Sequence, residues 1–404
     1  MDQSIFVVNA GSSSIKFKLY RVLGDDIEIA LGGAFDGIGS KPRFKAKDRS
    51  GKVLVERAFS AAEVSTSAQA QHVVADWLRT QISDSAIAGV GHRVVHGGSV
   101  YSQPVVVDDG VLATLEAIVP LAPLHQPSNL DPIRVLRNRH PDLPQVACFD
   151  TAFHRGHPEL SDRLALPHAL YDEGIRRYGF HGLSYEYVAA ALRKIAPDVA
   201  SGRVVIAHLG SGASACGLRD GRSIDSTMSF TALDGLPMGT RSGSIDPGVV
   251  LHLIEQKRMT PAQVERILYH ESGLFGLSGI SSDVRDLLTS ESRDAAMAID
   301  FFCLHVAQEI AKLTVSIGGL DGLVFTAGIG ENAPQVRRRV LEHLSWSGLS
   351  LDAAANQRNT TLIAAPGSKA KIFVIPTDEE RMIGLHTLRL LKQPETAQHS
   401  AAHV

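Results

Sequence analysis

Residues 9–16 of the sequence, NAGSSSIK, place small, polar and basic side chains between two apolar runs. Glycine and serine let a backbone approach a ligand closely, and their N–H and hydroxyl groups can surround phosphate oxygens, with Lys16 as the counter-charge. The same residues also suit a plain tight hairpin, in which Asn9 starts the turn and Lys16 lies on a solvated face. On this segment alone we favour the plain hairpin and keep the phosphate-binding turn as the alternative.

Two further glycine-rich stretches shift the balance towards phosphate binding. Residues 208–214, HLGSGAS, repeat the pattern, and residues 322–332, GLVFTAGIGEN, end another apolar run in Gly328 and Gly330. Pro334 then suits the first turn of a following helix, where its missing N–H costs nothing. Three strand ends whose loops tolerate a phosphate or a base predict a nucleotide between two domains.

Two charged side chains stand where apolar runs end. Arg93, in GHRVVHGG, suits a cation that reads a carboxylate or phosphate at the edge of an apolar pocket, and a surface arginine in a turn is an equally open interpretation. Asp150 follows the run VACF and suits a catalytic or metal-bound carboxylate, with helix N-capping as the competing use. Both residues need further context.

A histidine and a second arginine lie in glycine-rich segments. His181 stands in YGFHG before an amphipathic helix, and a lone histidine there is usually structural. Arg241 lies in LPMGTRSGSIDPG, which predicts a rigid loop rather than a strand. An exposed loop arginine usually has no special role, but one held among glycines could neutralise charge on a phosphoryl group in transfer.

The segments that must position these residues alternate between two patterns. Apolar, β-rich runs predict strands at 5–9, 15–20, 89–95, 145–149, 204–209, 322–326 and 371–375. Amphipathic spacing predicts helices at 68–84, 184–196, 294–317 and 333–344. This order predicts an α/β fold. Residues 7–20 and 204–221 each read as a strand, a Gly/Ser turn and a returning strand, so a duplicated chain and a chance likeness are both open.

Bulk composition narrows the class of protein. The chain has 404 residues, 44% of them apolar and 21% charged, so two ordinary domains are expected. A net charge of −3 predicts no nucleic acid or membrane partner and favours small-molecule chemistry. The three cysteines fit neither a disulfide framework nor a zinc site, and we see no secretory leader or membrane-spanning run, so we expect a cytoplasmic protein. The Walker GxxxxGK[ST] motif and the HRD and DFG motifs of protein kinases are absent.

Eight motifs together resemble a known family. The motifs run from about residue 5 to 390 and are NAGSSSIKF, GHRVVHGG, CFDTAFH, YGFHG, GTRSGSIDPG, SGISSD, FTAGIGEN and PTDEE. In order and spacing they resemble the motifs of the acetate kinases, in the acetate and butyrate kinase family. The resemblance implies the duplicated fold of actin, sugar kinases and heat-shock chaperone ATPases, with ATP in the cleft between two domains. It implies an acyl-side domain at 1–150 plus 381–404, closed by the last helix, and a nucleotide-binding domain at 151–380.

The resemblance also assigns site residues. It implies Asp150, His181 and Arg241 as catalytic, and Arg93, Val95, Leu124 and Phe180 as the acetate site. Asn9 and Glu379 match the positions that hold Mg²⁺, with Mn²⁺ possible in its place. The nucleotide contacts that it implies are Lys16, His208, Leu209, Gly210, Ser211, Gly212, Asp283, Val284, Arg285, Gly328, Ile329, Gly330, Glu331 and Asn332. Because acetate is already ionised at neutral pH, it needs no general base, so we expect Asp150 to orient the metal shell or an arginine.

Some positions depart from the family pattern. Many members have Asn in place of Ser211 and Gln126, a Thr-Ser-His run in place of Leu183-Ser184-Tyr185, and Pro in place of Ala232. Ser211 and Gln126 keep their hydrogen-bonding ability, and Tyr185 is expected to be structural. A smaller side chain at position 232 could admit propionate, because one methylene changes discrimination by only ~1–3 kcal/mol.

The expected reaction is reversible phosphoryl transfer from ATP to acetate, giving ADP and acetyl phosphate by direct in-line displacement. Propionate or butyrate as acceptor is the alternative within the family, and a non-catalytic, actin-like nucleotide-binding module is the alternative outside it. Against the module stand Arg93 beside a pocket and the few residues left after the final helix. The resemblance implies a homodimer, and the helix at 294–317 suits either the core or a subunit interface.

Overall fold

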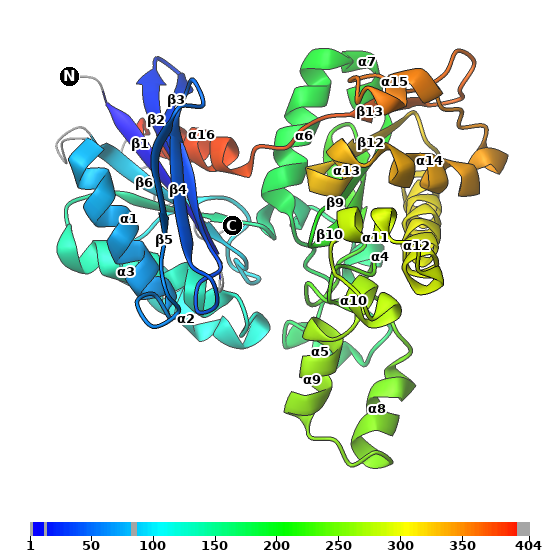
Figure 1. Ribbon diagram of the computed structural model, residues 1–404, viewed down its shortest axis with the longest axis horizontal. Coiled ribbons are helices and arrows are strands. Elements are labelled where there is room, and N and C mark those ends of the chain that lie inside the picture. Colours follow the sequence, from blue (N-terminus) through cyan, green and yellow to red (C-terminus); the bar gives the residue numbers. More distant parts are fainter. Residues whose placement is uncertain (1–2, 12–13, 82–86, 394–404) are drawn as a thin grey trace. The chain divides into compact units, whose positions relative to one another are not determined.

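The computed structural model describes residues 3–11, 14–81 and 87–393. The chain divides into two compact units, residues 1–153 with 378–404, and residues 154–377 (Figure 1). The sequence-based boundaries lay at 150/151 and 380/381. Ser12 and Ser13 of the first Gly/Ser turn and the end of the helix expected at 68–84 lie outside the described residues.

The first unit is built on an eight-stranded mixed sheet with strand order β5-β4-β3-β2-β1-β6-β8-β7. Its strands are β1 Ser4–Ala10, β2 Ser14–Leu23, β3 Asp26–Asp36, β4 Arg43–Asp48, β5 Val53–Ala58, β6 Ile87–Val94, β7 Val105–Val106 and β8 Gln145–Phe149. Strand β1 pairs antiparallel with β2 and parallel with β6, which pairs parallel with β8. Ile15, Phe17 and Leu19 of β2 are buried and alternate with more exposed Lys16 and Lys18, so the period-2 pattern of the sequence fixes which face enters the core.

Helices cover both faces of this sheet. They are α1 Ser67–Gln81, α2 Asp109–Ala117, α3 Gln126–Arg139 and α16 Glu379–Leu391, with 3₁₀ turns at Val119–Leu121 and Ala152–His154. Helices α1 and α3 contact β1, β2 and β6, and Figure 1 shows them on the side of the sheet away from α16. A side chain at Gly91 of β6 would collide with Thr387 and Ile383 of α16, whereas neighbouring Val90 packs into the core beneath α1 and α3. Glycine therefore lets the C-terminal helix lie close to the sheet.

The second unit contains a five-stranded sheet with strand order β11-β10-β9-β12-β13. Its strands are β9 Arg203–Leu209, β10 Ala213–Arg219, β11 Arg222–Ser226, β12 Gly322–Thr326 and β13 Lys371–Val374. Its helices are α4 Glu159–Asp162, α5 His168–Asp172, α6 Gly182–Ile195, α7 Pro197–Ala200, α8 Pro247–Glu255, α9 Pro261–His270, α10 Gly273–Ser278, α11 Val284–Thr289, α12 Arg293–Ile317, α13 Ala327–Asn332, α14 Pro334–His343 and α15 Ala353–Gln357, with a 3₁₀ turn at Ser345–Ser347. The side chain of Ser292 caps the start of α12, and Gly318, at φ 77°, ends it.

The two sheets share one topology. The run β3-β2-β1-β6-β8 of the first unit and the run β11-β10-β9-β12-β13 of the second each join three antiparallel strands to two parallel ones. The similar segments 7–20 and 204–221 fall on β1–β2 and β9–β10, the same place in each sheet. The α/β class and the duplication are therefore confirmed.

One local prediction is wrong. The third glycine-rich stretch, expected as a loop, forms helix α13, in which Asn332 Nδ2 donates to the Gly328 carbonyl at 2.9 Å. The chain enters this helix directly after β12 because Ala327 takes a left-handed conformation at φ 64°. Residues 236–246 of the expected loop LPMGTRSGSIDPG, which include Arg241, are free of helix and strand as predicted, while Pro247 and Gly248 begin α8.

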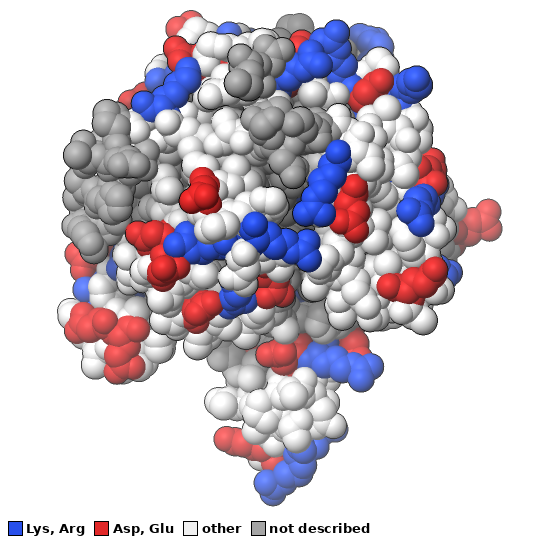
Figure 2. All heavy atoms as spheres, turned by 90° about the vertical axis from the view of Figure 1, so that its left-hand side faces the viewer, with Lys and Arg blue, Asp and Glu red and all other residues white. Residues whose placement is uncertain are grey.

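The one face of the molecule that Figure 2 shows agrees with the near-neutral composition. On the face shown in Figure 2, Lys and Arg lie beside Asp and Glu, and no broad patch of one sign is visible on its described part. Within the described ranges, every helix is too short or too polar to cross a membrane.

Candidate active site

In the first unit, a buried ion pair lies where two parallel strands end. Arg93 is next to last in β6, and Asp150 directly follows β8. Asp150 is 1% exposed, and its two carboxylate oxygens accept from Arg93 Nε at 3.1 Å and Nη2 at 2.5 Å. Burial opposes the charge on Arg93, but Asp150, Glu379 and Glu380 outweigh it and raise the pKa of Arg93 above its usual value. The contact fixes the plane and direction of the guanidinium.

Carboxylates gather beside this pair at the start of α16. Asn9, near the end of β1, donates through Nδ2 to Glu380 Oε1 at 3.0 Å, and its Oδ1 lies 3.5 Å from Arg93 Nη1. Burial raises the pKa of Glu379 to about 7, with Asp150 and Glu380 adding to the rise and Arg93 and Lys16 opposing it. Lys16, exposed on β2, pairs with Asn9 across the hairpin. This corner holds several hard oxygen donors, with Arg93, Lys16 and Lys18 as their counter-charges.

The backbone after Arg93 is held by two buried amide side chains. Asn129 accepts from the Val95 N–H at 2.8 Å and donates to the Ala10 carbonyl at 2.5 Å. Gln126, one of the departures from the family pattern, accepts from His96 N–H at 3.2 Å and donates to His96 C=O at 3.0 Å. Val95 is buried, and Leu124 is half-buried in the turn before α3. Gln126 thus holds the backbone of His96 in place. The asparagine that many family members have at this position is one methylene shorter.

In the second unit, His181 lies at the start of α6 in a left-handed conformation, φ 57°. Its ring stacks on His208 with a centroid separation of 4.3 Å, and its Nδ1 lies 2.8 Å from Ser214 Oγ. Ser184 in turn contacts His208 Nδ1 at 2.8 Å. A left-handed conformation at a non-glycine residue is strained, and such strain is found where the surroundings hold a side chain in place. Phe180 beside it is 2% exposed, and its carbonyl bonds to His154 Nε2 at 2.9 Å.

The turn between β9 and β10 passes beside His181 and Arg241. A Cβ placed on Gly212 would lie 3.3 Å from His181 Nε2 and 3.9 Å from Arg241 Nη1, so this glycine lets the backbone approach both groups. Arg241 Nη1 donates to the Ala232 carbonyl at 3.0 Å, and Met238 N–H donates to the Arg241 carbonyl at 3.1 Å. The structure therefore brings together the turn at 208–212, the histidine and the loop arginine.

The other residues expected to contact the nucleotide lie near this turn in two groups, at 283–285 and at 328–332. Gly239 N–H donates to Ser211 C=O at 3.3 Å, and Ser282, which precedes Asp283, packs against Gly239. Asp283 caps α11 and pairs with Arg285 at 2.6 Å, with Val284 buried between them. A Cβ on Gly330 of α13 would lie 3.7 Å from Leu209, so α13 adjoins the end of β9.

Sequence reasoning missed Arg337 of α14. Its side chain is fully buried and donates to the carbonyls of Gly330 at 2.7 Å and Glu331 at 3.0 Å, and to Asn356 and Asn359. Burial lowers the pKa of Arg337 to about 10. Leu341, four residues further along the same helical face, is buried, and this spacing was the signal that Arg337 faces inward. Arg337 holds the C-terminal half of α13.

Replacing Arg337 with methionine should lower the free energy of unfolding by about 3 kcal/mol or more, because several buried carbonyls lose their donor. ADP affinity should fall with it if α13 contacts the nucleotide. Urea unfolding and calorimetric ADP titration measure both quantities. Arg338→Met is the matched control, since Arg338 is exposed and pairs with Glu342 one turn further along the helix surface, and it should change stability by no more than about 0.5 kcal/mol. Equal stability of the two variants would contradict the assigned role.

Comparison with known proteins places these clusters in a family. The family model described as "Acetokinase family" matches residues 4–385. An acetate kinase of Nitrobacter hamburgensis is 54% identical over 389 residues, covering 96% of each chain. Among solved structures, a propionate kinase from Francisella tularensis has a TM-score of 0.88 at 34% identity, covering 95% of this chain and 98% of that one. An acetate kinase from Porphyromonas gingivalis has a TM-score of 0.85 at 33% identity, covering 96% of this chain and 100% of that one.

These findings confirm the resemblance that the eight motifs carried, and with it the fold class expected of acetate kinases. The family match extends over most of both units. The chain belongs to the acetokinase family.

Proposed function

We propose that this chain transfers the γ-phosphoryl group of ATP to acetate, giving acetyl phosphate and ADP, by direct in-line displacement. The observation that carries the proposal is the orientation of Arg93. Asp150 occupies Nε and Nη2 of the guanidinium, while the contact that Nη1 makes among the described residues, to Asn9 Oδ1, is long at 3.5 Å. An arginine held in this way can offer Nη1 to a carboxylate without losing its direction.

The proposed chemistry needs positioning and charge rather than a base. Acetate arrives ionised, so one of its oxygens can attack the γ-phosphorus directly. Arg93 would bind its other oxygen, and Val95, Leu124 and Phe180 would enclose the methyl group. Arg241 and His181 would stabilise the charge on the phosphoryl group in transfer, which is the main way in which proteins accelerate this reaction. Asp150 would act through Arg93 and move no proton.

ATP would enter as its Mg²⁺ complex, with Mn²⁺ as a possible substitute. Carbonyl and carboxylate oxygens suit Mg²⁺, and Asn9 Oδ1 and the Glu379 carboxylate would provide them. The described residues contain no group of three His, Cys, Asp or Glu side chains suited to a metal, which fits an ion held chiefly by the phosphates. Lys16, the 208–212 turn, residues 283–285 and residues 328–332 would contact the nucleotide. Residues 1–150 with 381–404 would then form the acyl-side domain and 151–380 the nucleotide-binding domain.

The reverse reaction tests this function. The protein, supplied with acetyl phosphate and Mg·ADP, should form ATP that luciferase detects, and omission of either substrate should abolish the signal. A protein that binds ADP but forms no ATP would overturn the kinase assignment in favour of a nucleotide-binding module.

Propionate is a second candidate acceptor because of Ala232. This residue is half-buried and its carbonyl anchors Arg241. Ala232→Pro keeps that carbonyl and enlarges the side chain, so it should lower the ratio of propionate to acetate kcat/KM about tenfold. Ala232→Ser, which changes the volume little, is the control. An unchanged ratio in Ala232→Pro would show that position 232 does not set acyl-chain preference.

We also propose that the protein works as a homodimer in the cytoplasm. Apolar side chains are exposed on α8, at Val249 and Leu251, and on α12, at Met297, Phe301 and Leu304. The α12 residues recur at i, i+4 and i+7 and so form one stripe, which a second subunit could cover. Light scattering during gel filtration would show a mass of one chain if this proposal is wrong.

A further inference from the structure

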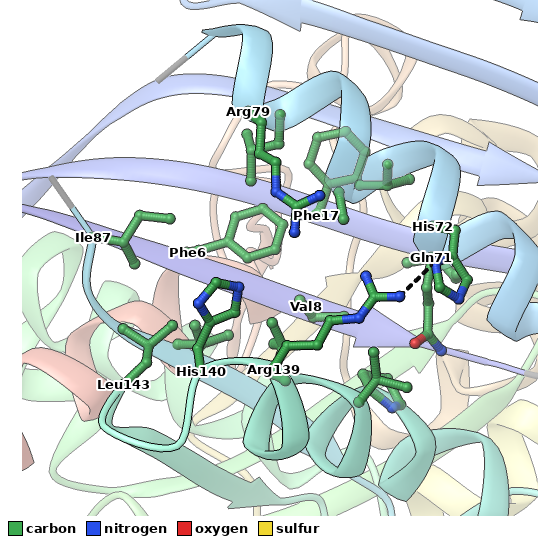
Figure 3. A pocket seen from close by; sticks show the side chains of 18 of the residues that line it. Phe6, Val8, Phe17, Gln71, His72, Arg79, Ile87, Arg139, His140 and Leu143 are labelled. Atoms are coloured by element: carbon green, nitrogen blue, oxygen red, sulfur yellow. Dashed lines mark hydrogen bonds between the residues drawn. The ribbon is translucent and has the colours of Figure 1, made fainter. Parts of the chain in front are cut away.

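A cavity of about 460 Å³ lies in the first unit between α1, α3 and the sheet (Figure 3). Buried apolar side chains of the strands form its floor, among them Phe6, Val8 and Phe17. Leu78 of α1 and Leu136 of α3 line its walls. This volume falls within the range of about 300–1,000 Å³ typical of sites for small organic ligands.

Basic side chains surround the apolar floor. Figure 3 shows the guanidinium groups of Arg79 and Arg139 pointing towards the hollow from α1 and α3, with the His140 ring between them and Leu143. Arg139 Nη2 contacts His72 Nδ1 at 3.0 Å, and no carboxylate among the described residues pairs with Arg139. Arg79 pairs with the exposed Asp76 at 3.1 Å. Asp142 is the one acidic residue of the described lining, which holds two arginines, and of these Arg139 has no carboxylate partner among the described residues.

The cavity is distinct from the residues proposed to act in phosphoryl transfer. Phe6 and Val8 of β1 face it, whereas Asn9, with the opposite side-chain direction, contacts Glu380 of α16. The same alternation on β2 directs Phe17 to the cavity and Lys18 to Asp378. The two sites therefore use opposite faces of the same strands.

We propose that this cavity binds a single-chain amphiphile with an anionic head, such as a medium-chain carboxylate. The apolar floor would take the acyl chain, and Arg139 with Arg79 would bind the head. A wholly apolar ligand would leave Arg139 without an anionic partner among the described residues, and a small inorganic anion would leave the floor empty. The apolar floor matches the acyl chain of a fatty-acid-like ligand, and the cations at the mouth of the cavity match its anionic head.

Tryptophan emission gives a direct readout. Trp77 of α1 packs against Phe17 with a centroid separation of 6.0 Å, and Phe17 lines the cavity. The other of the two tryptophans, Trp346, is 74% exposed in the second unit, so a Trp346→Phe background reports Trp77 alone. The full chain in this background is titrated, below micelle concentrations, with acetate, octanoate, decanoate, decyl phosphate and decanol.

The expected result is saturable binding of decanoate with about fifteenfold higher affinity than octanoate, because each of the two additional buried methylenes adds about a factor of four. Acetate should leave the signal unchanged, and decanol should bind at least about tenfold more weakly than decanoate. Decyl phosphate binding as tightly as decanoate would support an anionic head in general, and weaker binding would support a carboxylate. Equal affinity of octanoate and decanoate, or of decanol and decanoate, would overturn the proposal.

Two variants test separately how the cavity binds the anionic head and the acyl chain of the ligand. Arg139→Ala should weaken decanoate about tenfold, while Arg134→Ala, on the same helix but paired with Glu116 and Asp131 and outside the cavity lining, should leave it unchanged. Ala75→Phe, which fills the cavity from α1, should abolish binding while circular dichroism stays native. Equal decanoate affinity in Arg139→Ala and Arg134→Ala would refute the site. Since no phosphoryl transfer is measured, this outcome is independent of the proposed activity.

Discussion

Replacing Arg241 with alanine should lower turnover at least ~10²-fold while ADP affinity stays nearly unchanged. The guanidinium lies beside Gly212 and His181 and is tied to the Ala232 carbonyl, so its charge is fixed where the β9–β10 turn would hold phosphates. A group that stabilises charge only in the transition state changes kcat far more than binding. Hydroxamate trapping of the acyl phosphate gives kcat, and calorimetry gives the ADP affinity.

The control is Arg222→Ala, which removes an exposed arginine of β11 in the same unit and should leave both quantities unchanged. Arg241→Lys keeps the charge but not the planar fork, so it should recover only part of the turnover. Near-normal turnover in Arg241→Ala would remove this residue from the catalytic set.

Arg93→Ala should raise the KM for acetate about 10–100-fold, because a charge-assisted contact to the carboxylate is lost. The same change should lower the free energy of unfolding by about 3–5 kcal/mol, because it leaves the buried Asp150 carboxylate without its partner. Steady-state kinetics and urea unfolding separate the two effects. Turnover at saturating acetate should change less than KM.

A double variant separates the structural role of Arg93 from its proposed substrate role. In Arg93→Ala/Asp150→Asn the buried charge is gone, so stability should recover most of the loss while the KM for acetate stays high. If KM recovered together with stability, Arg93 would be a structural partner of Asp150 and no ligand of acetate.

The sequence predicted best the helices and strands that a single strong pattern defines, either an apolar run or an amphipathic period. The apolar run at 145–149 and the capped amphipathic stretch at 294–317 match β8 and α12 within one residue. Strands β3, β4 and β5 were missed, because Gly32 and Gly33 interrupt the alternation of β3 and the side chains of β5 are mostly exposed. Helix α13 was predicted as a loop because Gly328 and Gly330 are typical of turns. Its i→i−4 hydrogen bonds are therefore not evident from the sequence.

For the site, too, the sequence predicted which residues matter but not which residues they contact. Glycine-rich turns and strand-end charges singled out His181, Arg93 and Asp150 as candidates. That Asp150 binds Arg93 with both oxygens depends on the pairing of β6 with β8, which joins residues 57 positions apart. The stacking of His181 on His208 and the inward direction of Arg337 likewise follow from tertiary packing. Local pattern therefore predicts which residues are unusual, while their partners come from the fold.

The most direct test of the proposed function is kcat/KM for acetate, propionate and butyrate with Mg·ATP, measured by trapping each acyl phosphate as its hydroxamate. We predict that acetate leads, with Ser211, Gln126 and Ala232 as tolerated variation. A lead for propionate or butyrate would keep the reaction and contradict the acceptor. No hydroxamate from any of the three acids would contradict phosphoryl transfer to a carboxylate altogether.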